Sequence, residues 1–184
     1  QMISNLKDTT TKNKEQDWLK TNLARFSSMM QGQRSISAVA QLIMSELTPI
    51  VDANYGTFFI AGHEEGEPVL NLVASYAFTQ RKNISSKYHL KESLVGQCAF
   101  EKKRILITNP PESYVAIQSS LGEGTPKNIL LLPVVFEGEL KAVIELASFK
   151  PFSTNILNFL DQLMDSVGVI LNMLSYTMRT EELL

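Results

Sequence analysis

The stretch ILLLPVVF, from Ile129 to Phe136, constrains the fold more than any other part of the sequence. It is apolar without alternation, which is typical of a central strand that is covered on both faces of its sheet. The run LKAVIELASF, from Leu140 to Phe149, follows after three residues and is expected to pair with it. Pro133 cannot donate a hydrogen bond to a neighbouring strand, so we expect a bulge or a locally open edge there.

Two earlier strands are expected at Tyr55–Ala61 and Pro68–Phe78, because both segments are rich in aromatic and β-branched residues. They flank an acidic connection, which indicates a hairpin. A short helix with Ser93 as its N-cap and a strand over RILITN are expected next. Asn109–Asn128 contains two adjacent prolines and two glycines and is expected to be a loop with at most a turn or two of helix. Alternation in the second strand places five residues on one face: Leu70, Leu72, Ala74, Tyr76 and Phe78.

Segments with helical periodicity lie before and after these strands. One amphipathic helix is expected from Asp17, and a second is expected after Ser35, ending near Pro49. A long closing helix begins after Ser153 or Thr154, either of which is a suitable N-cap. Helices before and after a run of about five strands indicate the α+β class.

The closing helix carries two adjacent apolar rows, although a helix that covers one side of a globular domain needs only one. We expect one row to pack on the domain's own sheet. The other is expected to pack on the same helix of a second chain, in a parallel bundle that includes a row from the first helix. A single broad face buried within a monomer is the alternative. The residues expected to form this dimer contact are Leu19, Leu23, Phe26, Met30, Leu160, Met164, Val167, Leu171, Leu174 and Met178.

Composition and charge restrict the partners. The chain has 184 residues, of which 44% are hydrophobic and 20% charged, as expected for one globular domain. A net charge of -2 means that the chain has no excess of basic residues to bind nucleic acid or an anionic membrane surface, so neither is an expected partner. The single cysteine, Cys98, excludes an intrachain disulfide and fits a reducing compartment.

Three segments taken in order resemble the GAF domain family: SLVGQCAFEKKRILITN, NILLLPVVFEGELKAVIELASF, and PFS opening the last helix. The resemblance implies a central antiparallel sheet of about six strands, with the N- and C-terminal helices on one face. It also implies short helices and loops over a ligand cleft on the other face. The upstream segment NKEQDWLKTNLARF looks like the helix that joins a HAMP module to a GAF domain in bacterial hybrid sensor histidine kinases.

The expected organisation follows from this resemblance. Residues 1–16 are polar and are interpreted as a linker that resembles the exit of a HAMP module, and residues 17–31 as a connecting amphipathic helix. Residues 32–179 are expected to form the GAF domain, and residues 180–184 to begin a signalling helix that leads to a downstream module. By the resemblance, the segment belongs to the cytoplasmic portion of a bacterial protein anchored in the inner membrane.

Side chains that could support chemistry are sparse. The only histidines, His63 and His89, fall in polar segments and are expected at the surface. Cys98 lies in an apolar helical segment and is expected to be a buried, inert thiol. The glycines of LGEGTPKN lack the spacing of a phosphate-binding loop. These residues give no support for a bilin, a haem or a metal ion, and the cofactor stays unknown; an enzyme is therefore not expected.

A small-molecule cleft remains possible beneath the loop Asn109–Asn128, because long irregular loops in compact domains are often functional. The candidates to line it are Tyr76, Cys98, Tyr114, Ile117 and Pro133, and the alternative is that these side chains fill a second core. Two functions stay open. The first is a non-catalytic, homodimeric sensory module that relays a signal to kinase domains of the same chain, and the second is a monomeric regulatory domain that binds a small molecule.

Overall fold

The computed structural model describes residues 2–77, 85–111, 117–119 and 122–183. Four helices and eight strands are found in these residues. In chain order they are α1 (Met2–Gln31), α2 (Ile36–Ile50), β1 (Tyr55–Glu64), β2 (Glu67–Tyr76), β3 (Lys87–His89), α3 (Ser93–Glu101), β4 (Ile105–Thr108), β5 (Ile117–Ser119), β6 (Gly122–Gly124), β7 (Asn128–Phe136), β8 (Glu139–Ser148) and α4 (Thr154–Leu183).

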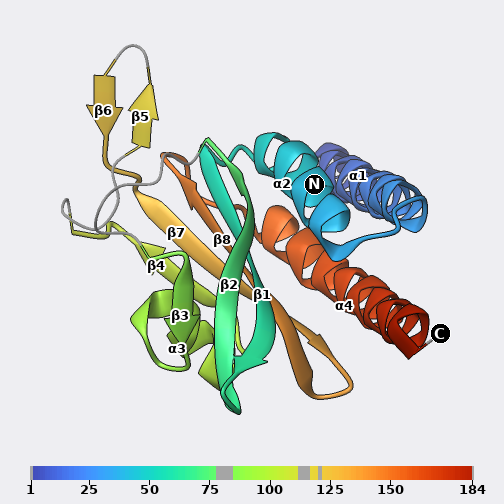
Figure 1. The fold of residues 1–184 in the computed structure, drawn as a ribbon. Coiled ribbons are helices and arrows are strands. Elements are labelled where there is room, and N and C mark those ends of the chain that lie inside the picture. Colours follow the sequence, from blue (N-terminus) through green and yellow to red (C-terminus); the bar gives the residue numbers. More distant parts are fainter. Residues whose placement is uncertain (1, 78–84, 112–116, 120–121, 184) are drawn as a thin grey trace.

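Six of the strands form one antiparallel sheet in the order β3-β2-β1-β8-β7-β4, which confirms the predicted α+β class (Figure 1). Tight hairpins connect β1 to β2 and β7 to β8, where Glu65 and Glu137 adopt positive φ ahead of a glycine. β5 and β6 form a separate two-stranded hairpin within the segment expected to be a loop. The short strand β3 was not predicted.

Helices cover the sheet unequally. α2 and α4 pack on one face, and α1 packs on these two helices as an outer layer (Figure 1). A large apolar core fills the space between these helices and the sheet. α3 covers the opposite face, over a smaller second core. Apolar side chains on both faces of β7 are buried, as predicted for a central strand.

Local signals fixed two of the helix starts. The Ser35 hydroxyl accepts a hydrogen bond from Ala38 N at 3.1 Å, and the Ser153 hydroxyl accepts one from Ile156 N at 3.2 Å. The Ser153 cap agrees with the sequence prediction, and α2 begins where a helix was predicted, directly after Ser35. The expected Ser93 cap is wrong, because Glu92 precedes the first turn of α3 and Ser93 itself has φ +61°.

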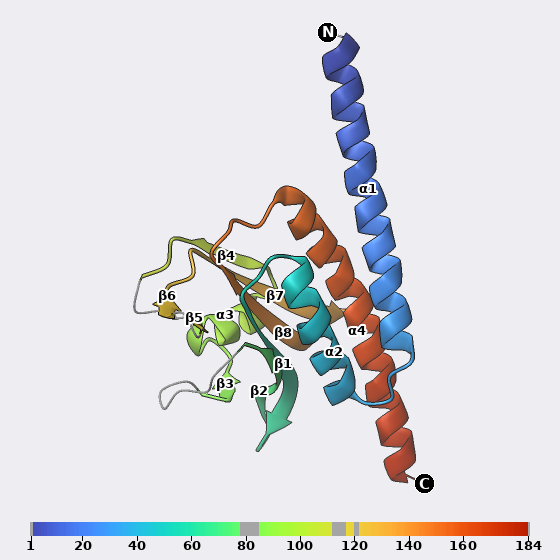
Figure 2. The same cartoon turned by 90° about the horizontal axis from the view of Figure 1, so that it is seen from above.

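α1 is longer than the sequence pattern indicates. It begins at Met2, so the polar residues interpreted as a linker continue the same helix. Residues 2–17 are all exposed, because this half of α1 extends beyond the rest of the domain (Figure 2). Apolar periodicity could not reveal this half of the helix, since it has no neighbour in the chain against which to bury a face.

Two irregularities in the sheet alter which side chains meet. Pro133 lies beyond the last residue of β7 that pairs with β4, so no strand of the described residues needs its missing N–H, and the predicted open edge is confirmed. In β2, Val73 has no partner on β1, because Phe58 pairs with Ala74 and Phe59 with Leu72. Because of this bulge, the side chains of β2 after Val73 point to the opposite faces of the sheet from those that regular alternation predicts.

The rows of α4 expected to face a second chain lie inside this one. Among the described side chains of that set, Phe26, Met30, Leu160, Met164, Val167, Leu171 and Leu174 are buried, and Leu19 and Leu23 are partly exposed. The Met178 side chain lies outside the described residues. These residues are buried in the chain's own core, and α1 of the same chain packs on the neighbouring residue Phe159. Trp18 and Phe26 of α1 meet Phe159 of α4 at ring-centroid distances of 5.0 and 6.0 Å.

α1 and α4 run side by side in the same direction, so the two ends of the chain lie at opposite ends of the domain (Figure 2). Asn22, which is buried in this helix layer, donates a hydrogen bond to Trp18 O at 2.8 Å. No helix in the described part of the chain has the length and apolarity needed to cross a bilayer.

Candidate functional site

The candidate site lies on the face of the sheet that α3 covers. Side chains from β1, β7 and β8 alternate between the two cores, so every second residue of these strands points toward α3. The second core is apolar, and its buried members are Tyr55, Phe59, Leu70, Val95, Cys98, Ala99, Ile129, Leu131, Val143 and Ala147. Two polar side chains interrupt this apolar surface near its centre.

Glu145 is the first of them. It lies between Val143 and Ala147 on β8, so it shares their face, and only 8% of its surface is exposed. Burial raises the pKa of Glu145 from 4.5 to about 7. No hydrogen-bond donor among the described residues is found on its carboxylate. A buried carboxyl group without a partner is costly, and such groups are concentrated at functional sites.

Thr57 is the second. It pairs with Glu145 in the register of β1 and β8, which places the two side chains next to each other on one face. Its buried hydroxyl has no hydrogen-bond partner among the residues that the structure describes. Two adjacent buried polar groups that lack partners form a ready recognition surface, because a ligand with hydrogen-bond donors and acceptors satisfies both.

Tyr88 of β3 borders the same area. Its ring packs on Phe59 at a centroid distance of 5.6 Å. Burial, and then the nearby negative charge of Glu145, raise the pKa of the Tyr88 hydroxyl. Glu145 and Thr57 therefore form a polar pair within an apolar surface, which Tyr88 borders beside Phe59.

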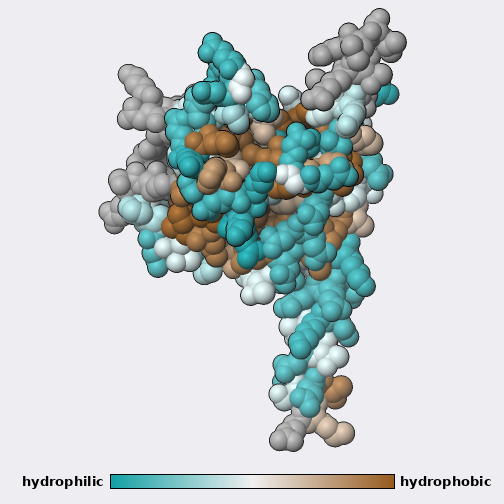
Figure 3. Space-filling model, turned by 90° about the horizontal axis from the view of Figure 1, so that it is seen from below, coloured by the Kyte–Doolittle hydropathy of each residue, from teal (hydrophilic) through white to brown (hydrophobic). Residues whose placement is uncertain are grey.

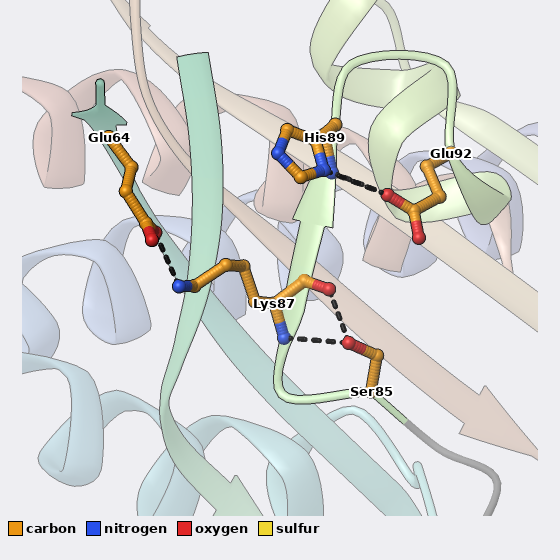
Figure 4. Close-up of polar contacts among 5 residues, drawn as sticks. All are labelled: Glu64, Ser85, Lys87, His89 and Glu92. Atoms are coloured by element: carbon orange, nitrogen blue, oxygen red, sulfur yellow. Dashed lines mark hydrogen bonds and ion pairs between the residues drawn. The ribbon is translucent and has the colours of Figure 1, made fainter. Parts of the chain in front are cut away.

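Exposed polar contacts surround β3, which pairs with β2 at the edge of the sheet (Figure 4). The Lys87 ammonium reaches past β2 to the carboxylate of Glu64 and lowers its pKa. The Glu92 carboxylate accepts a hydrogen bond from His89 N at 2.9 Å, and its pKa is also lowered, first by this bond. His89 and Glu92 are more than half exposed, and His63 is exposed, so both histidines lie at the surface as predicted.

Cys98 is buried in the second core, as predicted for an inert thiol. Its Sγ donates to Lys103 O at 3.3 Å. Burial, with a smaller effect from Glu101, raises the pKa of Cys98 to about 12, so the thiol stays protonated near neutral pH. Across the described ranges, no three His, Cys, Asp or Glu side chains are grouped in a way that could bind a metal ion.

The other expected lining residues are dispersed. Tyr76 packs against the first core, on the opposite face from Cys98, because the bulge at Val73 reverses the facing of β2; placing it in the same cleft was wrong. Pro133 alternates with Ile129 and Leu131 and is half-buried on the α3 side. Tyr114 and the side chain of Ile117 lie outside the described residues.

Glu145 and Thr57 were missed from the sequence, although one signal was available. In AVIELAS, Glu145 is the only charged residue in an otherwise apolar run. A charge within a strand that is buried on both faces cannot reach solvent without leaving the sheet. Thr57 gave no comparable signal, because threonine is common in strands.

Comparison with known proteins agrees with this architecture. The family model described as GAF domain matches residues 33–172, well over half of the chain. The chain therefore belongs to the GAF domain family and is a sensory or regulatory domain. No curated protein sequence matches it.

Solved structures show the same fold at low identity. The GAF domain of a phosphoenolpyruvate-protein phosphotransferase from Coxiella burnetii is 17% identical with a TM-score of 0.69, covering 90% of this chain and 97% of that chain. A methyl-accepting chemotaxis protein is 15% identical with a TM-score of 0.63, covering 83% and 98%. A free methionine-R-sulfoxide reductase from Neisseria meningitidis, in complex with its substrate, is 13% identical with a TM-score of 0.65, covering 84% and 89%.

Proposed function

We propose that this chain is a non-catalytic sensory module of a sensor histidine kinase, which relays a signal along α1 and α4 to kinase domains of the same protein. One observation carries the proposal: α1 and α4 pack side by side in the same direction, so the signal enters at one end of the domain and leaves at the other (Figure 2). A rotation or shift of α1 reaches α4 through their shared core. Neither step requires chemistry within the domain.

Aromatic packing couples the two helices. Phe159 of α4 is fully buried and contacts two rings of α1 that lie about two helical turns apart, those of Trp18 and Phe26. Close-packed rings do not slide independently, so displacement of α1 changes the packing of α4. Arg25 of α1 also pairs with Glu46 of α2 at 2.8 Å, but both side chains are exposed and this ion pair contributes little.

Gly168 couples α4 to the sheet. A Cβ atom built at this position lies 2.8 Å from the Val135 carbonyl oxygen, so the helix approaches the backbone of β7 as closely as a glycine permits. β7 pairs along its length with β8, which carries Glu145 on the other face. A ligand that shifts β8 on the α3 side therefore acts on α4 through one intervening strand.

The proposed homodimer uses a different surface from the rows expected from the sequence. Val169, Met173 and Tyr176 follow one another at i, i+4 and i+7 on α4 and are 51%, 51% and 64% exposed. The partly exposed Leu19 and Leu23 of α1 are its proposed extension. We name the three α4 residues the outer stripe and propose that a second copy of the chain covers it.

Sedimentation velocity at several concentrations tests the dimer. We expect the mass of the native chain to rise with concentration, and the double variant Val169→Glu with Met173→Glu to remain a monomer. Leu106→Glu with Phe149→Glu is the matched control, because these two side chains are exposed apolar residues outside α4. A native chain that is monomeric at every concentration, or a double variant that associates unchanged, would reject the proposed homodimer.

A monomeric regulatory domain that binds a small molecule is the second candidate. Glu145 and Thr57, which have no hydrogen-bond partner in the described part of the chain, favour it, as does the burial of the expected dimer rows within one chain. It requires a ligand with hydrogen-bond donors for the carboxylate, and a rise in melting temperature without self-association. Native mass spectrometry of the purified chain tests for a retained small molecule, which Glu145→Gln should lose if the carboxylate binds it.

A further inference from the structure

The sheet splits at the end near the β1–β2 and β7–β8 turns. β1 pairs with β8 from Tyr55 to Ile60, and the two strands then separate. β1 continues only with β2, to Glu64, and β8 begins at Glu139 paired only with β7. Residues 61–64 and 139–141 therefore face each other across a gap that no strand of the described chain fills.

A cavity of about 730 Å³ occupies this gap, within the usual range for small-molecule sites. Its walls come from both layers of the molecule: Ile36 and Leu171 from the α2/α4 side, and Ala99 and Phe100 from the α3 side. Figure 3 looks onto this end of the molecule, where apolar side chains show between polar ones. The cavity is distinct from the Glu145 site, since neither Glu145 nor Thr57 lines it.

The charged groups of this cavity are mainly cationic, with Lys102 and Lys141 against Glu139. Lys141 has a side chain that is only 12% exposed, and its Nζ lies 3.3 Å from Glu139, whose side chain is 72% exposed. Lys102 Nζ donates to Gly138 O at 2.7 Å. Two lysines against one glutamate leave one positive charge, beside His63 at the rim. The largely buried ammonium group of Lys141 has three N–H donors, and among the described residues it makes one ion pair.

We propose that this cavity binds an organic monocarboxylate with an apolar body. The carboxylate pairs with Lys141 and balances the single excess charge, and the apolar body lies against Ile60, Leu140 and Leu171. A phosphate dianion fits less well, because it needs several convergent donors and the described walls are largely apolar. The bound molecule touches both the sheet and α4, so it acts on the helix that leaves the domain. Tyr176 lines this cavity and also belongs to the outer stripe, so the two proposed surfaces meet at that residue.

Calorimetric titration with octanoate, octanamide and octylamine tests the proposal. We expect octanoate to bind with 1:1 stoichiometry, and the neutral and cationic analogues to bind at least about tenfold more weakly. Lys141→Met removes the charge and keeps most of the stem, and it should weaken octanoate binding at least about tenfold. Lys150→Met, an exposed lysine past the other end of β8, is the matched control and should leave affinity unchanged.

A second pair of variants tests the cavity itself. Gly62 lines it, and a Cβ atom there meets nothing within 4 Å, so Gly62→Phe fills the space without a backbone clash and should abolish octanoate binding. Gly32→Phe is the control, because Gly32 has equal room but lies outside the cavity. Thermal unfolding verifies that each variant is folded. Absence of octanoate binding, equal binding of all three probes, or binding unchanged in Lys141→Met and Gly62→Phe would overturn the proposal.

Discussion

Glu145→Gln should remove a large pH dependence of stability. Burial raises the pKa of Glu145 from 4.5 to about 7, so between these values the folded chain holds a proton that the unfolded chain has released. Raising the pH across this window therefore lowers the free energy of unfolding. The difference between the two pKa values corresponds to about 3 kcal/mol, of which about 2.5 kcal/mol falls between pH 5 and pH 8.

The glutamine variant keeps a side chain of similar shape without the ionisable group. Relative to the native chain, we expect it to gain about 2.5 kcal/mol in the free energy of unfolding as the pH rises from 5 to 8. Urea denaturation of both proteins at half-unit steps of pH measures this difference and cancels the contributions of other groups. Glu67→Gln, at an exposed position of β2, is the matched control, and its free energy of unfolding should change with pH as that of the native chain does.

A flat difference between the native chain and Glu145→Gln across pH 5 to 8 would refute the reasoning. It would show that the folded and unfolded states hold the Glu145 proton equally, and hence that the carboxyl group is hydrated or paired in the folded state. The argument for a recognition site around Glu145 would then fail as well, because that argument depends on a desolvated, unpartnered carboxylate.

Three further outcomes are expected. Gly168→Ala should lower the free energy of unfolding by about 1–3 kcal/mol despite the better helix propensity of alanine, because its Cβ would lie 2.8 Å from Val135 O; Gly62→Ala, in open space, is the control in urea denaturation. Phe159→Ala should cost about 3–5 kcal/mol in the same assay, because it removes the fully buried ring between α4 and α1, and a cost under about 1 kcal/mol would contradict that packing. Cys98 should react with a thiol reagent at pH 8 only slowly until urea unfolds the chain, because its pKa is about 12, and rapid labelling of the native protein would be the contrary result.

Much of the fold could be predicted because the relevant signals are local. The two long hairpins follow from β-rich segments around short turns, and the starts of α2 and α4 follow from the serines that cap them. β3 has only three residues and gave no periodic signal. The exposed first half of α1 gave none either, since a helix without a buried face has no apolar row.

The site was harder to predict, because it depends on which residues share a face. A single unpaired residue, Val73, moves Tyr76 away from the second core, and no feature of the strand's sequence marks that bulge. The pairing of Thr57 with Glu145 depends on register between β1 and β8, which are adjacent in the sheet but far apart in the chain. The cavity at the split end likewise depends on where that pairing stops.

The sequence by itself determined that α4 has two apolar rows to bury and that β7 is covered on both faces. Only the tertiary structure decided what covers them: the row expected to meet a second molecule, from Leu160 to Leu174, is buried in the chain's own core, and α1 packs on the neighbouring Phe159 through Trp18 and Phe26. The physical reason is that hydrophobic burial is non-directional. A periodic pattern states how much surface must leave water, and any complementary surface within reach can satisfy it.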